Sequence, residues 1–120
     1  MISKSTKNLV SFIAGDSTLI QELLHPKNED VAINYSLALA ELKVGTQSDP
    51  HILKNQSELY FILEGEGTAH IGDEVVVLQK EDFVWIPKGV KQYIINTGES
   101  VLRFLCIVST PWTAKDEIVL

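Results

Sequence analysis

The sequence contains a single cysteine, Cys106, among its 120 residues. One cysteine excludes an internal disulfide and every zinc site that is built from several thiolates. Cys106 lies within the segment 102–108, which is apolar apart from Arg103. We interpret it as a small core residue, because a reactive thiol needs an electropositive and accessible setting.

Basic residues and long apolar runs are also scarce. Ten lysines and arginines stand against sixteen acids, which gives a net charge of −6. A broad nucleic-acid surface needs basic residues to displace counterions, so we expect no nucleic-acid partner. No run approaches ~18 apolar residues, and the first residues lack an apolar leader with a cleavage site, so we expect neither a membrane span nor secretion. The expected location is the cytoplasm.

What the sequence does contain is an ordinary globular composition, 45% hydrophobic and 22% charged. One short helix is expected near residues 18–24. Asp16, Ser17 and Thr18 are candidate N-caps, the four apolar residues between 19 and 24 fall on one helical face, and Pro26 blocks continuation.

The rest of the chain is rich in short β-type runs that are separated by Gly, Asp, Asn and Pro. The expected strands are 31–43, 51–53, 58–63, 68–71, 74–78, 82–86, 92–96 and 102–109. Gly72 and Asp73 between two runs predict a tight hairpin. Many short strands at even spacing predict an all-β sandwich or barrel.

The run 59–63, Leu-Tyr-Phe-Ile-Leu, is apolar on both alternating faces. One face is expected to look into the barrel, and the other to meet a second sheet, the N-terminal segment or another subunit. A homodimer is the economical explanation for a chain of this size.

Two groups of residues have the spacing of the two cupin motifs, G-x5-H-x-H-x3–4-E-x6-G and G-x5-P-x-G-x2-H-x3-N. Seven of the ten fixed positions match: Gly45, His51, Glu58, Gly65, Pro87, Gly89 and Asn96. The three departures are Leu53, Glu81 and Gln92. The chain therefore resembles the cupin superfamily, and in particular a small single-domain cupin with the type-2 barrel.

This resemblance implies a double-stranded β-helix, the jelly-roll barrel, with a short N-terminal helix. The barrel would span residues 31–112, with an extension over 1–30 packed on it and a tail over 113–120. The resemblance also implies that two histidines and the glutamate of the first motif, with the histidine of the second, bind a divalent metal. Leu53 and Gln92 occupy two of those four positions, and Leu53 cannot bind a metal.

The residues themselves support one location for a site. Positions 51 and 53 share a strand face, as do Glu58 and Tyr60, so His51, Glu58, Tyr60 and Gln92 are the candidate ligand-binding residues. The metal candidates are His51, Glu58 and Gln92, for Zn, Mn, Fe or Ni. The amide oxygen of Gln92 is a poorer ligand than imidazole, so we expect a degenerate site that is weakly filled or empty.

Three functions remain open from the sequence. The leading hypothesis is a barrel that binds a small molecule near the degenerate metal site. The resemblance also allows a metal-dependent cupin enzyme of the isomerase, epimerase, decarboxylase, lyase or dioxygenase type. The third is a non-catalytic structural or regulatory protein with a packed barrel, in which His51, Glu58 and Gln92 form a polar network without metal.

Overall fold

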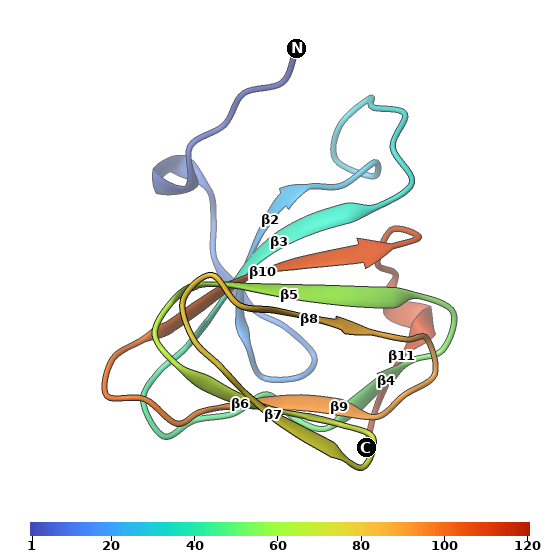
Figure 1. Cartoon of the computed structure of the whole chain (residues 1–120). Helices are drawn as coiled ribbons and strands as arrows, with labels where there is room; N and C mark the ends of the chain where they lie inside the picture. Colours follow the sequence, from blue (N-terminus) through green and yellow to red (C-terminus); the bar gives the residue numbers. More distant parts are fainter.

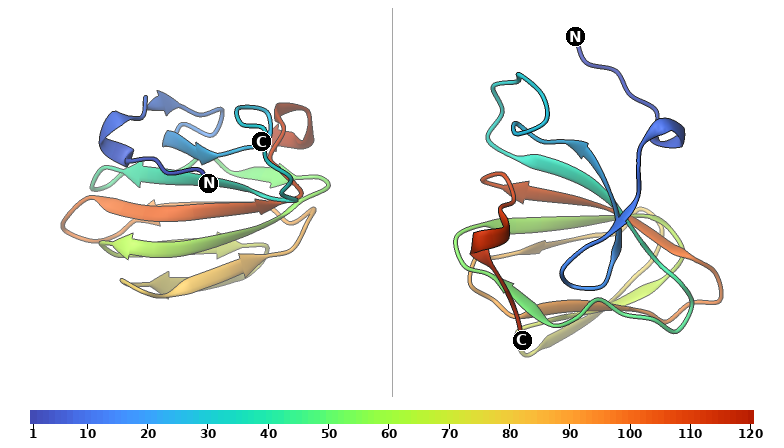
Figure 2. Two further views of the ribbon diagram at one scale, coloured as in Figure 1. Left: turned by 90° about the horizontal axis from the view of Figure 1, so that it is seen from above. Right: turned by 180° about the vertical axis from the view of Figure 1, so that it is seen from behind.

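The computed structural model describes residues 1–120 as two antiparallel sheets that face each other across one interior (Figure 1). The first sheet has the strand order β1-β2-β3-β10-β5-β8, and the second has the order β11-β4-β9-β6-β7. Strands of the first sheet lie side by side in the left view of Figure 2. The all-β jelly-roll architecture expected from the sequence is confirmed.

The first sheet consists of β1 (Phe12–Ile13), β2 (Leu19–Leu24), β3 (Ser36–Leu42), β10 (Leu102–Ser109), β5 (Ser57–Glu64) and β8 (Phe83–Ile86). The second consists of β11 (Glu117–Val119), β4 (His51–Leu53), β9 (Gln92–Asn96), β6 (Gly67–Ile71) and β7 (Glu74–Leu78). All eight expected strands are present, most of them within a residue of the expected bounds. The hairpin between β6 and β7 turns at Gly72, whose φ of 59° suits a residue without Cβ.

The prediction of a helix near residues 18–24 is wrong, because this segment forms strand β2. It pairs antiparallel with β3, with Ile20 opposite Ala40. A helix of two turns is only marginally stable on its own. The apolar spacing of this segment fits either a helix or a strand, so its pairing with β3 determines that it forms a strand. The expected N-cap Asp16 instead accepts the backbone N–H of Thr18 in the turn before β2.

The helical content is two short 3₁₀ turns, η1 (Thr6–Asn8) and η2 (Ala114–Asp116). No helix in the chain is long and apolar enough to cross a membrane. Both ends of the chain contribute to the sheets: β2 extends the first sheet beside β3, and β11 extends the second beside β4. Segments near both termini therefore lie beside barrel strands: β2 beside β3, and β11 beside β4, which carries His51.

The interior changes from polar to apolar along β5. Its inward-facing residues are Glu58, Tyr60 and Ile62, which are buried at alternate positions as a pleated strand requires. Ile62 is fully buried in the hydrophobic cluster with Ile94 and Leu102. One half of the barrel interior is thus a packed apolar core, and polar side chains gather at the start of β5.

Candidate functional site

Three of the sequence-predicted residues meet at this polar end of the barrel. Gln92 begins β9 and lies directly opposite His51, the first residue of β4. Glu58 comes from β5 in the facing sheet. All three side chains are buried, with relative exposures of 8% or less. The structure therefore places one residue of the second motif beside two of the first, inside the barrel.

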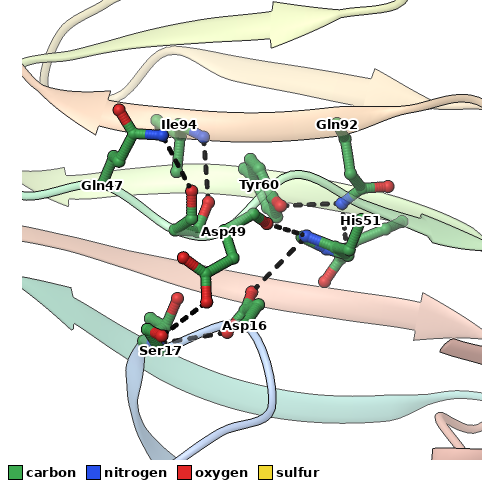
Figure 3. Close-up of polar contacts among 11 residues, drawn as sticks. Asp16, Ser17, Gln47, Asp49, His51, Tyr60, Gln92 and Ile94 are labelled. Carbon is green, nitrogen blue, oxygen red and sulfur yellow. Dashed lines mark hydrogen bonds and ion pairs between the residues drawn. The ribbon is translucent and has the colours of Figure 1, made fainter. Parts of the chain in front are cut away.

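Gln92 forms the centre of a buried hydrogen-bond network (Figure 3). Its amide nitrogen donates to Glu58 Oε1 at 2.6 Å and to the Tyr60 hydroxyl oxygen at 2.7 Å. A carboxylate accepts hydrogen bonds only, so the nitrogen of the amide faces Glu58. Because an amide nitrogen is not a metal ligand, this arrangement matches the network alternative of the sequence analysis.

Burial dominates the electrostatics of this network. Loss of solvation raises the pKa of Glu58 from 4.5 to about 7, against the opposing influence of His51 and the hydrogen bond from Gln92. Burial and the nearby Glu58 raise the pKa of Tyr60 and of Cys106 well above their usual values. Glu58 therefore exchanges a proton near neutral pH, whereas Cys106 stays a thiol in the core, as its apolar neighbours predicted.

His51 is held by the chain on one side of its ring. Its Nδ1 lies 2.8 Å from the backbone carbonyl oxygen of Asp49. A carbonyl oxygen only accepts, so Nδ1 carries the proton and Nε2 of the neutral ring carries the lone pair. The same Nδ1 lies 3.8 Å from Asp16 Oδ2, which reaches the site from the turn between β1 and β2.

A second group of side chains, Asp16, His51 and Glu117, could hold a metal ion. One ligand atom from each residue lies within 4.8 Å of the others. Asp16 and Glu117 lie outside both motifs, near the two ends of the chain, and sequence reasoning missed them. Nothing in the local sequence marks them, because their approach to His51 depends on how β2 and β11 join the sheets.

The position of Glu117 follows from strand pairing. Glu117 lies directly opposite Leu53 in the β4–β11 pair, and directly opposite residues in an antiparallel pair project from the same face. Glu117 thus brings a carboxylate to the neighbourhood of Leu53, which has no ligand atom of its own. Burial raises the pKa of Glu117, while the nearby His51 lowers it.

A cavity of about 90 Å³ opens beside these groups and is lined by His51, Glu58 and Tyr60, though not by Gln92. On the same measure a single water needs only about 10–15 Å³, so a small organic molecule fits. Four carboxylates line the cavity, from Asp16, Glu22, Glu58 and Glu117, and no lysine or arginine does. Lys27 Nζ neutralises the charge of Glu22, whose Oε2 lies 3.2 Å away. The other three carboxylates have no lysine or arginine partner in the lining, so the cavity is acidic.

The metal set implied by the two motifs does not fit these side chains. Leu53 offers no ligand atom, and Gln92 turns its amide nitrogen toward Glu58. Only His51 and Glu58 remain of the four positions, and two ligands do not make a transition-metal site. The three side chains that could hold a metal are Asp16, His51 and Glu117, of which only His51 is shared with the motif set.

Comparisons with known proteins agree with the fold. Residues 38–108 match the cupin domain family. An uncharacterised protein of Methanocaldococcus jannaschii is 34% identical over 109 residues, which cover 91% of this chain and 86% of that protein. An oxalate-binding protein of Thermotoga maritima is 28% identical over 89 residues, or 72% of this chain and 74% of that protein.

Solved structures give the same result at the level of fold. A predicted oxalate decarboxylase from Thermotoga maritima superimposes with a TM-score of 0.80 at 21% identity, over 91% of this chain and 99% of that one. Ectoine synthase from P. lautus gives 0.78 at 24% identity, over 100% and 90%. At these identities the likeness extends to the architecture alone. The family match and the 34% identical relative show that this chain belongs to the cupin family.

Proposed function

We propose that this cupin binds a small molecule in the cavity at the polar end of its barrel. The observation that carries the proposal is the cavity of about 90 Å³ beside Glu58 and Tyr60, whose polar atoms Gln92 holds in place. A barrel that served only as a packed core would fill this space with apolar side chains.

The charges of the cavity narrow the class of ligand. Asp16, Glu58 and Glu117 line it without a lysine or arginine beside them. In the absence of metal, such walls favour a ligand with a cationic or hydrogen-bond-donating group and disfavour a dicarboxylate. Glu58 is the expected contact for that group, with Tyr60 and His51 as neighbours and Gln92 as the residue that orients Glu58.

Saturation-transfer NMR on chelator-treated protein tests this proposal with two probes of similar length, ethylenediammonium and oxalate. Oxalate is included because one relative is named as an oxalate-binding protein. We expect signal transfer to the diammonium probe, loss of transfer in Glu58→Gln and in His51→Ala, and no change in Glu99→Gln. The last variant makes the same chemical change on an exposed loop. Unchanged transfer in both cavity variants, or no transfer to either probe, would refute the proposal.

Metal-dependent catalysis is the second candidate, and the Asp16–His51–Glu117 group is the observation that favours it. The cupin neighbours include proteins named as oxalate decarboxylase and as ectoine synthase. Turnover of any substrate that persists after thorough chelation would eliminate the metal-dependent form of this candidate.

We also propose that two copies of the chain associate through the outer face of the first sheet. Two apolar rows cross β10, β5 and β8 on this face, in the register Ile107–Leu59–Trp85 and Leu105–Phe61–Phe83. On β3 the second row ends at Leu39, which is already buried within the chain. Trp85 and Phe83 at the sheet edge are 58% and 61% exposed. A flat apolar face can meet an identical face about a two-fold axis and bury both.

Light scattering on a size-exclusion column measures the mass of the assembly. We expect a dimer for the natural chain and a monomer for Trp85→Glu, because a carboxylate in the interface loses its hydration. Val44→Glu is the matched control, since Val44 is 53% exposed on a loop away from the two rows. A monomer for the natural chain at every concentration would overturn this association.

A further inference from the structure

We infer that Asp16, His51 and Glu117 bind one divalent transition-metal ion, at a position that the cupin motifs do not specify. The inference goes beyond the proposed small-molecule binding, because it concerns a cation held by residues from both ends of the chain. One ligand atom from each side chain already lies within 4.8 Å of the others. Metal–ligand bonds of about 2.0–2.2 Å require ligand atoms about 4 Å apart or less, so the longest of these distances has to shorten by about 1 Å when an ion binds.

The donor types suit such an ion. A neutral imidazole with two carboxylates combines a nitrogen ligand with hard oxygen ligands, which Zn²⁺, Mn²⁺ and Fe²⁺ accept. Three carboxylates surround His51 without a basic partner, because Glu58 lies nearby as well as Asp16 and Glu117. A divalent cation offsets this concentration of negative charge.

The turn that carries Asp16 is fixed in place before any ligand arrives. The Asp16 carbonyl oxygen accepts the backbone N–H of Asp49 at 2.6 Å, and the Ser17 hydroxyl donates to Asp49 Oδ2 at 2.6 Å. The backbone N–H of Thr18 donates to Asp16 Oδ1, which orients the carboxylate. Asp49 also accepts from His51, so one residue positions two of the three ligands.

Glu117 reaches the same turn from the other end of the chain. A Cβ placed on Gly15 would lie 3.2 Å from Glu117 Oε2, which locates this carboxylate oxygen against the β1–β2 turn. The pairing of β11 with β4 sets the height of Glu117 along the barrel, opposite Leu53. The Glu117 backbone pairs within the chain, but its carboxylate oxygens make no hydrogen bond or ion pair and are free to act as ligands.

An independent observation also indicates a ligand at this position. Thr18 lines the cavity together with Asp16, His51 and Glu117. Its side chain is 2% exposed, and its hydroxyl oxygen has no hydrogen-bond partner in the chain. Buried polar groups are nearly always satisfied, so this hydroxyl is available to a ligand in the cavity, including a water molecule held by a bound ion.

Calorimetric titration of EDTA-treated full chain with Mn²⁺ alone tests the inference, with no organic molecule present. We expect one ion bound per chain and an affinity at least about tenfold lower in Asp16→Asn and in Glu117→Gln. Glu22→Gln is the matched control, because Glu22 lines the same cavity outside the three ligands and its carboxylate is already paired with Lys27. Its affinity should stay within about threefold of that of the natural chain.

The outcomes separate this inference from the proposed function. No Mn²⁺ binding, or equal loss in Glu22→Gln and Glu117→Gln, overturns the metal site and leaves the diammonium test in chelator unaffected. Unchanged affinity in both Asp16→Asn and Glu117→Gln overturns it as well. Electron paramagnetic resonance of bound Mn²⁺, recorded on variants whose circular dichroism matches that of the natural chain, excludes misfolding as the cause of a lost signal.

Discussion

Two polar groups share one end of the barrel and differ in how their polar atoms are satisfied. Glu58, Tyr60 and Gln92 lie on central strands and bond to one another. Asp16 and Glu117 come from the chain ends, and they approach His51 without a hydrogen bond between the three side chains. The first group is closed, and the second has ligand atoms to spare.

This difference separates a group whose geometry is already fixed from a group whose charges lack partners. A buried network whose members satisfy each other stabilises one arrangement of the core, and here it holds the Glu58 carboxylate and the Tyr60 hydroxyl in place at the cavity wall. A cluster of like charges with few partners costs stability and gains from a cation. The cupin-like motifs thus place a stabilising network here, and the segments outside them supply the open ligand atoms.

The largest expected effect on stability comes from removing Gln92, the centre of the closed network. Gln92→Leu leaves the Glu58 carboxylate and the Tyr60 hydroxyl buried without their shared donor, which should lower the free energy of unfolding by about 4 kcal/mol. Asp16→Asn, in the open cluster, should change it by less than about 0.5 kcal/mol. Urea denaturation measures both. Equal losses in the two variants would mean that the two groups do not differ in this way.

The pH dependence of stability sharpens the comparison next. The pKa of Glu58 is about 7 in the folded chain, against 4.5 for a solvated glutamate carboxyl, so between these pH values the folded chain binds more protons than the unfolded one. The contribution of Glu58 is therefore fully present below pH 4.5 and is lost as pH rises through 7. The rise in pKa corresponds to about 3 kcal/mol.

Glu58→Gln removes this titration and keeps an acceptor for Gln92. The stability difference between the natural chain and Glu58→Gln should change by about 3 kcal/mol from pH 4 to pH 8, measured by urea denaturation in EDTA. Glu99→Gln on the exposed loop is the control. A difference that stays constant with pH would show that Glu58 is solvated in the folded chain.

The fold could be predicted from the sequence because its signals are local. Short apolar runs, turn residues and the spacing from Gly45 to Asn96 each report on a few neighbouring positions, and together they define eight strands. The segment 18–24 could not be assigned correctly in this way, because its apolar spacing suits both a helix and a strand, and only its partner β3 distinguishes them.

The site could be predicted only in part, for the same reason. His51, Glu58, Tyr60 and Gln92 belong to the motifs or share a strand face with them, so their convergence was foreseeable. Asp16 and Glu117 are 101 positions apart in the sequence, and they meet through the pairing of β11 with β4 and the turn before β2. No local pattern encodes a contact of that separation.

Metal-dependent stability is the third test. A ligand that binds only the folded chain stabilises it by about 2.7 kcal/mol when its free concentration is a hundredfold above Kd. Mn²⁺ at that excess should raise the free energy of unfolding of the natural chain and of the control Glu22→Gln by this amount. Glu117→Gln, at the same Mn²⁺ concentration, should gain little. Stabilisation of all three chains alike would indicate binding outside the cluster.

The smallest expected effect concerns how the chain end is attached. Asp116, next to Glu117, is buried and accepts hydrogen bonds from the side chains of Asn55, Gln56 and Thr113. These hydrogen bonds, of which the one from Thr113 has the largest effect, lower the pKa of Asp116 to about 2. Its contribution is therefore present above pH 4 and is lost only as pH falls through about 2, so the carboxylate is ionised in every metal titration near neutral pH.

Asp116→Asn places an amide NH₂ group where the side chains of Asn55, Gln56 and Thr113 already donate hydrogen bonds. The repulsion between donors should weaken the attachment of β11 while leaving all three proposed ligands in the chain. We expect Mn²⁺ affinity to fall about threefold, while the pH dependence due to Glu58 is unchanged. Calorimetry and urea denaturation measure the two quantities. A loss as large as that in Glu117→Gln would make the attachment of β11 the main determinant of the open cluster. An unchanged affinity would mean that strand pairing with β4 alone holds Glu117 in place.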